Sequence, residues 1–164
     1  MELSMKIDSE GDPPCPFTPA AIGKLESVFK EELPLLAQGV EDYSEVEVSV
    51  SFLNRAEMRD VNKQHRGLDE PTDVLAFPLW GKDERFMPSA AFGLLPLGDI
   101  VICPEEVERE HAPMARMEGL CLVLAHGFLH LLGWDHDTTD KELAMWDRQE
   151  LLKSKLLNAI EEGF

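Results

Sequence analysis

The segment from Ala125 to His136, A-H-G-F-L-H-L-L-G-W-D-H, constrains this chain more than any other. It holds three of the five histidines. His126 and His130 are four residues apart, so on a helix their imidazole rings lie on one face, one turn apart. Gly133 can adopt the left-handed conformation that ends a helix and turns the chain, which returns His136 to the same point. The spacing predicts a helix and a turn that together hold one metal ion.

Three protein ligands leave a fourth position open for water, as in catalytic zinc sites. We therefore expect one Zn2+ per chain, held by His126, His130 and His136. The alternative, three unrelated histidines, is disfavoured by their grouping in so short a segment. The ligand spacing also matches the metzincin proteases, whose motif begins H-E-x-x-H. Gly127 replaces that glutamate and cannot act as a general base, which argues against a protease of that type.

The 164 residues have the length of one compact domain, so we expect residues 1–164 to form a single metallohydrolase domain. No apolar run approaches the roughly 20 residues that span a bilayer, and the N-terminus lacks the basic and apolar blocks of a signal peptide. Both features predict a cytoplasmic protein with no membrane contact. The three cysteines are scattered and do not form a disulfide framework.

Hydrophobic periodicity and capping residues predict strands that alternate with helices, with helices dominating the C-terminal half. Strands are expected at residues 2–8, 45–52, 73–77 and 98–103. Helices are expected at residues 19–36, 54–65, directly after 104, at 114–132, and from a capping box at Thr139 onward. Core candidates on the last helix are Leu143, Trp146, Leu151 and Leu157. Residues 79–96 are expected as a long loop.

This order of elements favours a small α+β (or α/β-like) fold with one sheet. The metal site would then lie on a helix of the C-terminal half and on the turn that follows it.

With Gly127 in second place and Asp135 before the last histidine, the histidine segment resembles the signature of the YbeY family. These proteins are bacterial endoribonucleases that act in ribosomal RNA maturation and in quality control of the small ribosomal subunit. Residues 62–78, N-K-Q-H-R-G-L-D-E-P-T-D-V-L-A-F-P, are similar to the central motif of the family, which carries an arginine at the position of Arg66. Residues 97–100, L-G-D-I, resemble a third family pattern.

The resemblance covers most of the chain from Val46 to His136, with the motifs in order. Ala76 stands where many members have serine, a departure that leaves the chemistry untouched. The resemblance implies a mixed four-stranded sheet packed with helices, one zinc ion and a cytoplasmic location. It also implies single-stranded RNA as the substrate, in particular ribosomal RNA, and small-subunit proteins as partners.

Arg66 is the candidate catalytic residue. A planar guanidinium matches phosphate geometry, and near a metal it would stabilise the charge that builds on the phosphoryl oxygens. From the residues alone, Arg66 could equally form a structural ion pair with Asp69 or Asp73. The resemblance favours the catalytic role.

Three carboxylates are weaker candidates for orienting the metal ligands. Asp135 and Asp137 flank the last histidine and could hold an imidazole N–H. Asp99 follows a glycine at a strand start and could do the same or cap a turn. The group that takes the proton stays open, since a metal hydroxide needs no protein base and the 2′-OH of the RNA could itself attack.

The net charge of −17 prevents RNA binding through the overall electrostatic field, so a local basic patch is needed. One candidate is a row of cations that recur at spacings of four, four and three and share a helical face. We call this row the basic stripe; it consists of Arg55, Arg59, Lys63 and Arg66. It predicts a track for the RNA backbone. The alternative is a solvated face paired with Glu57 and Asp60.

The leading hypothesis is a zinc-dependent endoribonuclease specific for single strands. One alternative is a zinc hydrolase of another class, such as a peptidase. Another is a non-catalytic, zinc-containing factor that associates with the ribosome. The remaining histidines, His65 and His111, flank expected helix ends and are expected at the surface.

Overall fold

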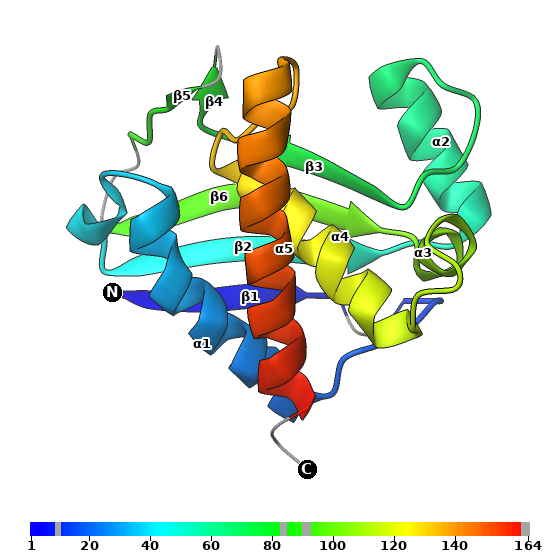
Figure 1. The fold of residues 1–164 in the computed structure, drawn as a ribbon, viewed down its shortest axis with the longest axis horizontal. Helices are drawn as coiled ribbons and strands as arrows, with labels where there is room; N and C mark the ends of the chain where they lie inside the picture. The colour runs from blue at the N-terminus through cyan, green and yellow to red at the C-terminus, as the bar shows by residue number, and fades with distance from the viewer. Residues whose placement is uncertain (9–10, 83–84, 90–92, 162–164) are drawn as a thin grey trace.

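A computed structural model describes residues 1–8, 11–82, 85–89 and 93–161 (Figure 1). Its elements, in chain order, are β1 (Glu2–Ile7), α1 (Pro19–Leu36), the 3-10 helix η1 (Val40–Asp42), β2 (Glu45–Phe52), α2 (Arg55–Arg66), β3 (Val74–Pro78), β4 (Gly81–Lys82), β5 (Arg85–Phe86), β6 (Leu94–Ile102), α3 (Pro104–Glu110), α4 (Arg116–Leu131) and α5 (Thr139–Glu161). The expected alternation of strands and helices is therefore present.

Four strands form one sheet in the order β1-β2-β6-β3. β1, β2 and β6 run parallel, and the edge strand β3 pairs antiparallel to β6. The fold is α+β with a mixed four-stranded sheet, which confirms the expected class. Because β3 lies at the edge, the residues around it can face a cavity rather than another strand.

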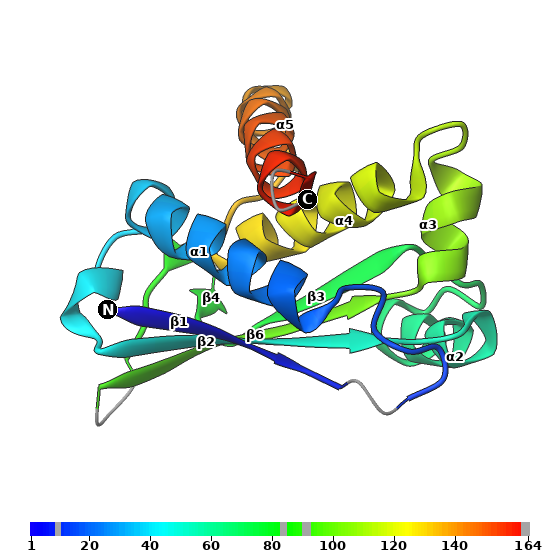
Figure 2. The same cartoon turned by 90° about the horizontal axis from the view of Figure 1, so that it is seen from below.

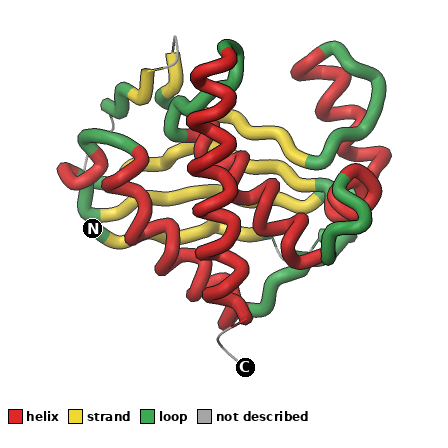
Figure 3. Tube along the Cα trace, viewed as in Figure 1, coloured by secondary structure: helices red, strands yellow, loops and turns green. Residues whose placement is uncertain are grey.

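The helices α1 and α4 lie on the same face of the sheet, and α5 packs across both of them on the outer side (Figures 2 and 3). The alternation along β2 agrees with this layering, since its buried positions are Val46, Val48, Val50 and Phe52. α2 contributes to a second, smaller apolar cluster, in which Met58 packs with Leu75 and Cys103. Residues of the basic stripe are thus held by a helix separate from the one that carries the histidines.

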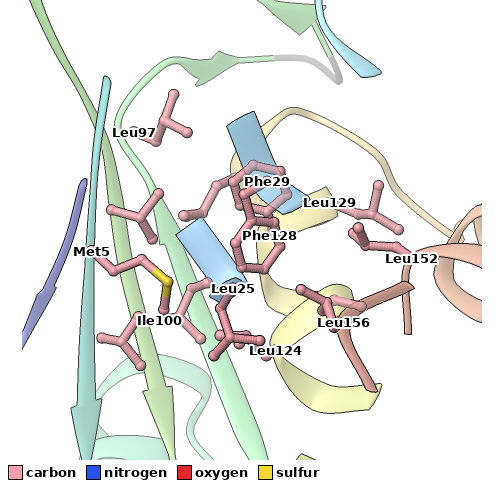
Figure 4. Packing of buried hydrophobic residues seen from close by; sticks show 14 of the residues in the cluster. Met5, Leu25, Phe29, Leu97, Ile100, Leu124, Phe128, Leu129, Leu152 and Leu156 are labelled. Atoms are coloured by element: carbon pink, nitrogen blue, oxygen red, sulfur yellow. The ribbon is translucent and has the colours of Figure 1, made fainter. Parts of the chain in front are cut away.

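Close packing of α4 on the sheet fixes the position of the histidine helix (Figure 4). The rings of Phe29 and Phe128 lie 4.1 Å apart between their centroids. At Gly127, an added Cβ would lie 2.8 Å from Cγ2 of Ile100 on β6. Any side chain at residue 127 would therefore clash with Ile100 unless that side chain or α4 shifted. The glycine that replaces the protease glutamate faces the core.

Several expected element boundaries are wrong. β6 begins at Leu94, four residues before the expected strand, because this segment pairs with β2 from Glu45 onward. The expected loop at 79–96 contains the small β4–β5 pair; its residues 83–84 and 90–92 lie outside the described residues. The capping residue of α5 is Thr138, whose hydroxyl accepts from the backbone N–H of Lys141, in place of the expected Thr139.

The expected core face of α5 is also mostly wrong. Leu143, Trp146 and Leu151 are exposed. Leu157 packs against the core. The buried side chains are Met145, Gln149, Leu152, Leu156 and Ile160. Both faces of this helix carry apolar residues, so periodicity alone could not choose the face that docks on α1 and α4. None of the described helices is long and apolar enough to cross a membrane.

Candidate metal centre

The three histidines of the signature segment converge. Nε2 of His126 and Nε2 of His130 are 3.1 Å apart, and the ring of His136 lies 6.0 and 5.3 Å from these two rings, respectively, between centroids. One ligand nitrogen from each residue lies within 4.8 Å of the others. Two nitrogens bound to one tetrahedral zinc at 2.0–2.1 Å would be roughly 3.3 Å apart, close to the separation of the first pair. The donor set is therefore compatible with a metal.

The turn after α4 brings the third histidine back. Gly133 has φ +88°, in the left-handed region that a non-glycine residue rarely adopts. The N–H of Trp134 donates to the carbonyl of Leu129 at 3.0 Å, and its indole Nε1 donates to the carbonyl of Leu36 at 3.1 Å. These bonds tie the turn to α1, so His136 is presented from a fixed loop.

A buried glutamine orients the first histidine. Oε1 of Gln149, on α5, lies 2.6 Å from Nδ1 of His126. An amide oxygen can only accept, so Nδ1 of His126 carries the proton and the lone pair of Nε2 is free for a metal. The sequence motifs do not indicate Gln149. Its one signal is its place on the buried face of α5, which differs from the face that the sequence predicts to be buried.

The environment keeps the two helical imidazoles neutral. Burial lowers the pKa of His126, and the charges of His136 and His111 add to this, whereas the bond to Gln149 and the charge of Asp73 oppose it. Burial, followed by the neighbouring His126 and His136, lowers the pKa of His130 to about 4. A metal requires neutral imidazole, so the site is ready for one at neutral pH.

A cavity of about 790 Å³ opens beside the three histidines. Its walls come from α2, the edge strand β3, the loop after α3, α4 and α5. Besides the histidines, its lining includes Arg66, Asp73, His111, Trp134, Asp135, Trp146 and Gln149. A metal, a guanidinium and an exposed aromatic ring can therefore meet one substrate.

Arg66 lies at the end of α2 and lines this cavity. The two carboxylates considered as its structural partners bond elsewhere: Asp69 accepts from Arg59, and Asp73 accepts from His111. Among the described residues, Arg66 forms no ion pair with either of them. Its guanidinium is thus available to a ligand in the cavity.

The rest of the basic stripe is only partly available. Arg55 forms an ion pair with Glu106, whose side chain is buried. Arg59 forms a bidentate ion pair with Asp69, in which Nε and Nη2 donate to the two carboxylate oxygens at 2.8 and 3.1 Å. Lys63 is exposed. The carboxylates weighed from the sequence, Glu57 and Asp60, were the wrong partners for the two arginines, because the actual partners lie farther along the chain.

The three candidate carboxylates lie in different places. Asp135 lines the cavity and accepts from the backbone N–H of His136 at 2.7 Å. Asp137 lies 3.5 Å from Nζ of Lys141. Asp99 is exposed on β6, next to Ile100, whose side chain faces α4. Because successive strand residues face opposite sides, Asp99 lies away from the histidines.

A second pair of ionisable side chains, Asp73 and His111, lines the same cavity, and Glu110 lies near this pair on α3. Asp73, directly before β3, accepts from the backbone N–H of Val74 at 2.7 Å and lies 2.8 Å from Nε2 of His111. Burial, then the charges of Asp73 and Glu106, raises the pKa of Glu110 to about 7. The expectation that His111 is a plain surface residue is wrong, because the loop after α3 folds it against β3. Its exposed side-chain fraction is 26 %.

Comparison with known proteins decides the family. Residues 19–157 match the family described as Endoribonuclease YbeY. The chain belongs to this family. Among curated members named Endoribonuclease YbeY, the protein of Shouchella clausii is 41% identical over 128 residues, covering 75% of this chain and 80% of its own. That of Thermoanaerobacter sp. (strain X514) is 36% identical over 141 residues, covering 80% of this chain and 87% of its own.

A solved structure supports the fold of this YbeY family member. The solution structure of TM1509 from Thermotoga maritima matches with a TM-score of 0.54 and 26% sequence identity. The match covers 98% of this chain and 93% of that one. Membership of the family supports endoribonuclease activity, a hydrolase reaction with RNA as the substrate.

Proposed function

We propose that this protein is a zinc-dependent endoribonuclease specific for single-stranded RNA, with residues 1–164 acting as one domain. One observation carries the proposal: the cavity that holds the convergent histidines also holds the guanidinium of Arg66. Three convergent imidazoles form the donor set of catalytic zinc, with one position left open, and burial lowers the pKa of two of them, His126 and His130.

The division of roles follows from the geometry. When bound, zinc supplies Lewis acidity, which polarises a phosphoryl oxygen and lowers the pKa of water. Gln149 holds His126 in the tautomer that leaves Nε2 free for the metal. Arg66 stabilises the negative charge that grows on the oxygens of the scissile phosphate in the transition state. Asp135 fixes the backbone at His136.

The wall formed by α5 supports the proposed preference for single strands. Trp146 lines the cavity and has an exposed fraction of 58 %. An exposed indole face stacks on an unpaired base, and such stacking is worth about 1–3 kcal/mol per base. The faces of paired bases are covered by their neighbours in a duplex, so a duplex cannot use this contact.

Ribosomal RNA is the substrate we propose, with small-subunit proteins as partners and the cytoplasm as the location. These three assignments depend on the family resemblance. The net charge of −17 opposes RNA binding over the surface as a whole, so we propose that the RNA backbone contacts the exposed cations Lys63 and Arg66.

The test is cleavage of labelled RNA by the metal-loaded protein, with and without a chelator. Single-stranded RNA should be cut and its paired duplex spared, and zinc should restore the activity that the chelator removes. The His136→Ala variant serves as the matched control and should cut neither. Intact single-stranded RNA under every metal tried would contradict the proposal. Digestion of a peptide mixture in its place would favour the peptidase alternative.

A further inference from the structure

His111 and Asp73 form a hydrogen-bonded pair beside the metal centre that the proposed roles leave unused. Nε2 of His111 lies 2.8 Å from Oδ2 of Asp73. The other oxygen of Asp73 accepts from the backbone N–H of Val74 at 2.7 Å. Both oxygens of this carboxylate are therefore engaged, and the carboxylate holds the imidazole in a fixed orientation.

The bond to Asp73 also selects the tautomer. An ionised carboxylate only accepts, so the proton of a neutral His111 resides on Nε2. Nδ1 is then the nitrogen with a free lone pair. This arrangement, an imidazole oriented by a carboxylate through one nitrogen while the other accepts a proton, is the general design of a histidine base.

The position of the pair matches that role. Both residues line the cavity that contains the three histidines and Arg66. His111 comes from the loop after α3 and Asp73 from the start of β3, so the pair approaches the cavity from the side of the edge strand. The ligands His126 and His130 come from α4.

We propose that His111 is the proton acceptor of the cleavage reaction and that Asp73 is its positioning residue. Nδ1 of His111 takes the proton of the attacking hydroxyl, that of water or of the ribose 2′-OH. A bond forms from this oxygen to phosphorus, and the bond from phosphorus to the leaving sugar oxygen breaks. The leaving oxygen takes a proton from solvent, and the imidazolium returns its proton to solvent. This inference rests on the proposed function.

Titratable groups on three neighbouring elements interact with His111. Asp73, at the start of β3, bonds to its ring, and the charge of His111 acts on Glu110 of α3 and on His126 of α4. Glu106, also on α3, acts in turn on Glu110. The neighbours of His111 therefore include two carboxylates and one imidazole of the metal centre.

The experiment compares three variants in single-turnover cleavage at saturating RNA, with equal metal content verified in each. His111→Ala should slow the reaction by 100-fold or more, as for loss of a general base, and added imidazole should restore part of the rate. His111→Gln keeps an N–H donor for Asp73 but cannot take a proton, so it should be as slow as His111→Ala. The matched control His65→Ala, at an exposed histidine, should cut at the wild-type rate.

Asp73→Asn should slow cleavage by about tenfold without rescue by imidazole, because the base is present but misoriented. A His111→Gln variant within threefold of wild type would overturn the inference and leave His111 a structural role. The inference would also be overturned if His111→Ala is slow and added imidazole does not restore any of the cleavage rate. A wild-type protein that leaves RNA intact would overturn the proposed function together with this inference.

Discussion

The helix that carries the histidines and the helix that carries the basic stripe differ in how much of their chemistry is local. On α4, two ligands and the turn that returns the third lie within one short segment, so spacing determines their convergence. On α2, spacing aligns the four cations, but partners elsewhere in the chain decide which of them are free. Arg55 is paired with Glu106, 51 residues away. The convergence of the histidines is therefore determined locally, whereas the tertiary fold determines which cations of the stripe are available to a ligand.

The largest expected effect concerns the free end of the stripe. Arg66→Ala should lower the single-turnover rate by about 100-fold or more, because one preorganised donor to the phosphate is lost. Metal content, melting temperature and RNA affinity should stay close to wild type. If the Arg66→Ala variant cuts saturating RNA at the wild-type rate, Arg66 has a structural role and no role in catalysis. The proposed contrast between α2 and α4 would then be wrong.

The next effect tests whether zinc binding by the histidines of α4 depends on a side chain from another helix, Gln149 of α5. Gln149→Leu removes the acceptor for Nδ1 of His126 and should weaken zinc affinity by about 10–100-fold. Gln149→Glu keeps an acceptor at the same place and should bind zinc at least as tightly as wild type. Competition titration against a chromogenic chelator measures both. Equal affinity for all three proteins would mean that the histidines orient themselves.

Arg55, which is paired, and Lys63, which is exposed, should differ in two assays: thermal melting and the salt dependence of RNA binding. Among the described residues, Arg55→Ala leaves the buried Glu106 carboxylate with Arg109 as its remaining cationic partner, at 3.9 Å. Loss of a buried partner costs about 1–3 kcal/mol, which lowers the melting temperature by roughly 5 °C. Lys63→Ala should leave the melting temperature unchanged and make the salt dependence of RNA binding shallower by about one unit of slope or less.

Results in the opposite sense would reverse the assignment. If Arg55→Ala melts like wild type and loses a unit of salt slope, Arg55 contacts RNA and its pair with Glu106 carries no stability.

The smallest expected effect concerns the carboxyl group of Glu110, on α3. The pKa of Glu110 is raised to about 7, first by burial and then by Asp73 and Glu106. The folded state therefore binds the proton more tightly than the unfolded chain, whose glutamates have pKa near 4.5. Stability is lost as pH rises from 4.5 to 7, and the loss persists above 7.

Glu110→Gln removes this loss, so the variant should melt a few degrees higher than wild type at pH 8 and at nearly the same temperature at pH 4.5. Glu105→Gln, at another exposed carboxylate of the same helix, is the matched control. An equal shift of Glu110→Gln at both pH values would show that ionisation is not the cause.

Sequence patterns predicted those parts of the molecule whose causes are local. The alternation from Glu45 to Phe52 gave β2, and Asn54 with Glu57 forms the capping box that begins α2. The face that α5 buries could not be predicted, because Trp146 and Met145 are both apolar and only docking on α1 and α4 distinguishes them. Gln149 could not be predicted for the same reason, because it lies on the buried face of α5.

The pairing of His111 with Asp73 was hidden for a related reason. The two residues are 38 positions apart and meet only because the loop after α3 folds against the edge strand. No helical or strand period links them. Side chains that act together from separate elements are the part of a site that spacing cannot reveal.

We propose above that His126, His130 and His136 together hold one catalytic zinc ion. The most direct test is elemental analysis of protein purified without chelators, compared with the triple variant in which all three are replaced by alanine. The wild-type protein should contain one zinc per chain and the triple variant none. Wild-type metal should be lost as pH falls toward 4, because burial lowers the pKa of His130 to about 4 and protons then compete for its imidazole. Equal metal content in the two proteins, or metal that is fully retained at pH 3, would show that these histidines are not the ligands.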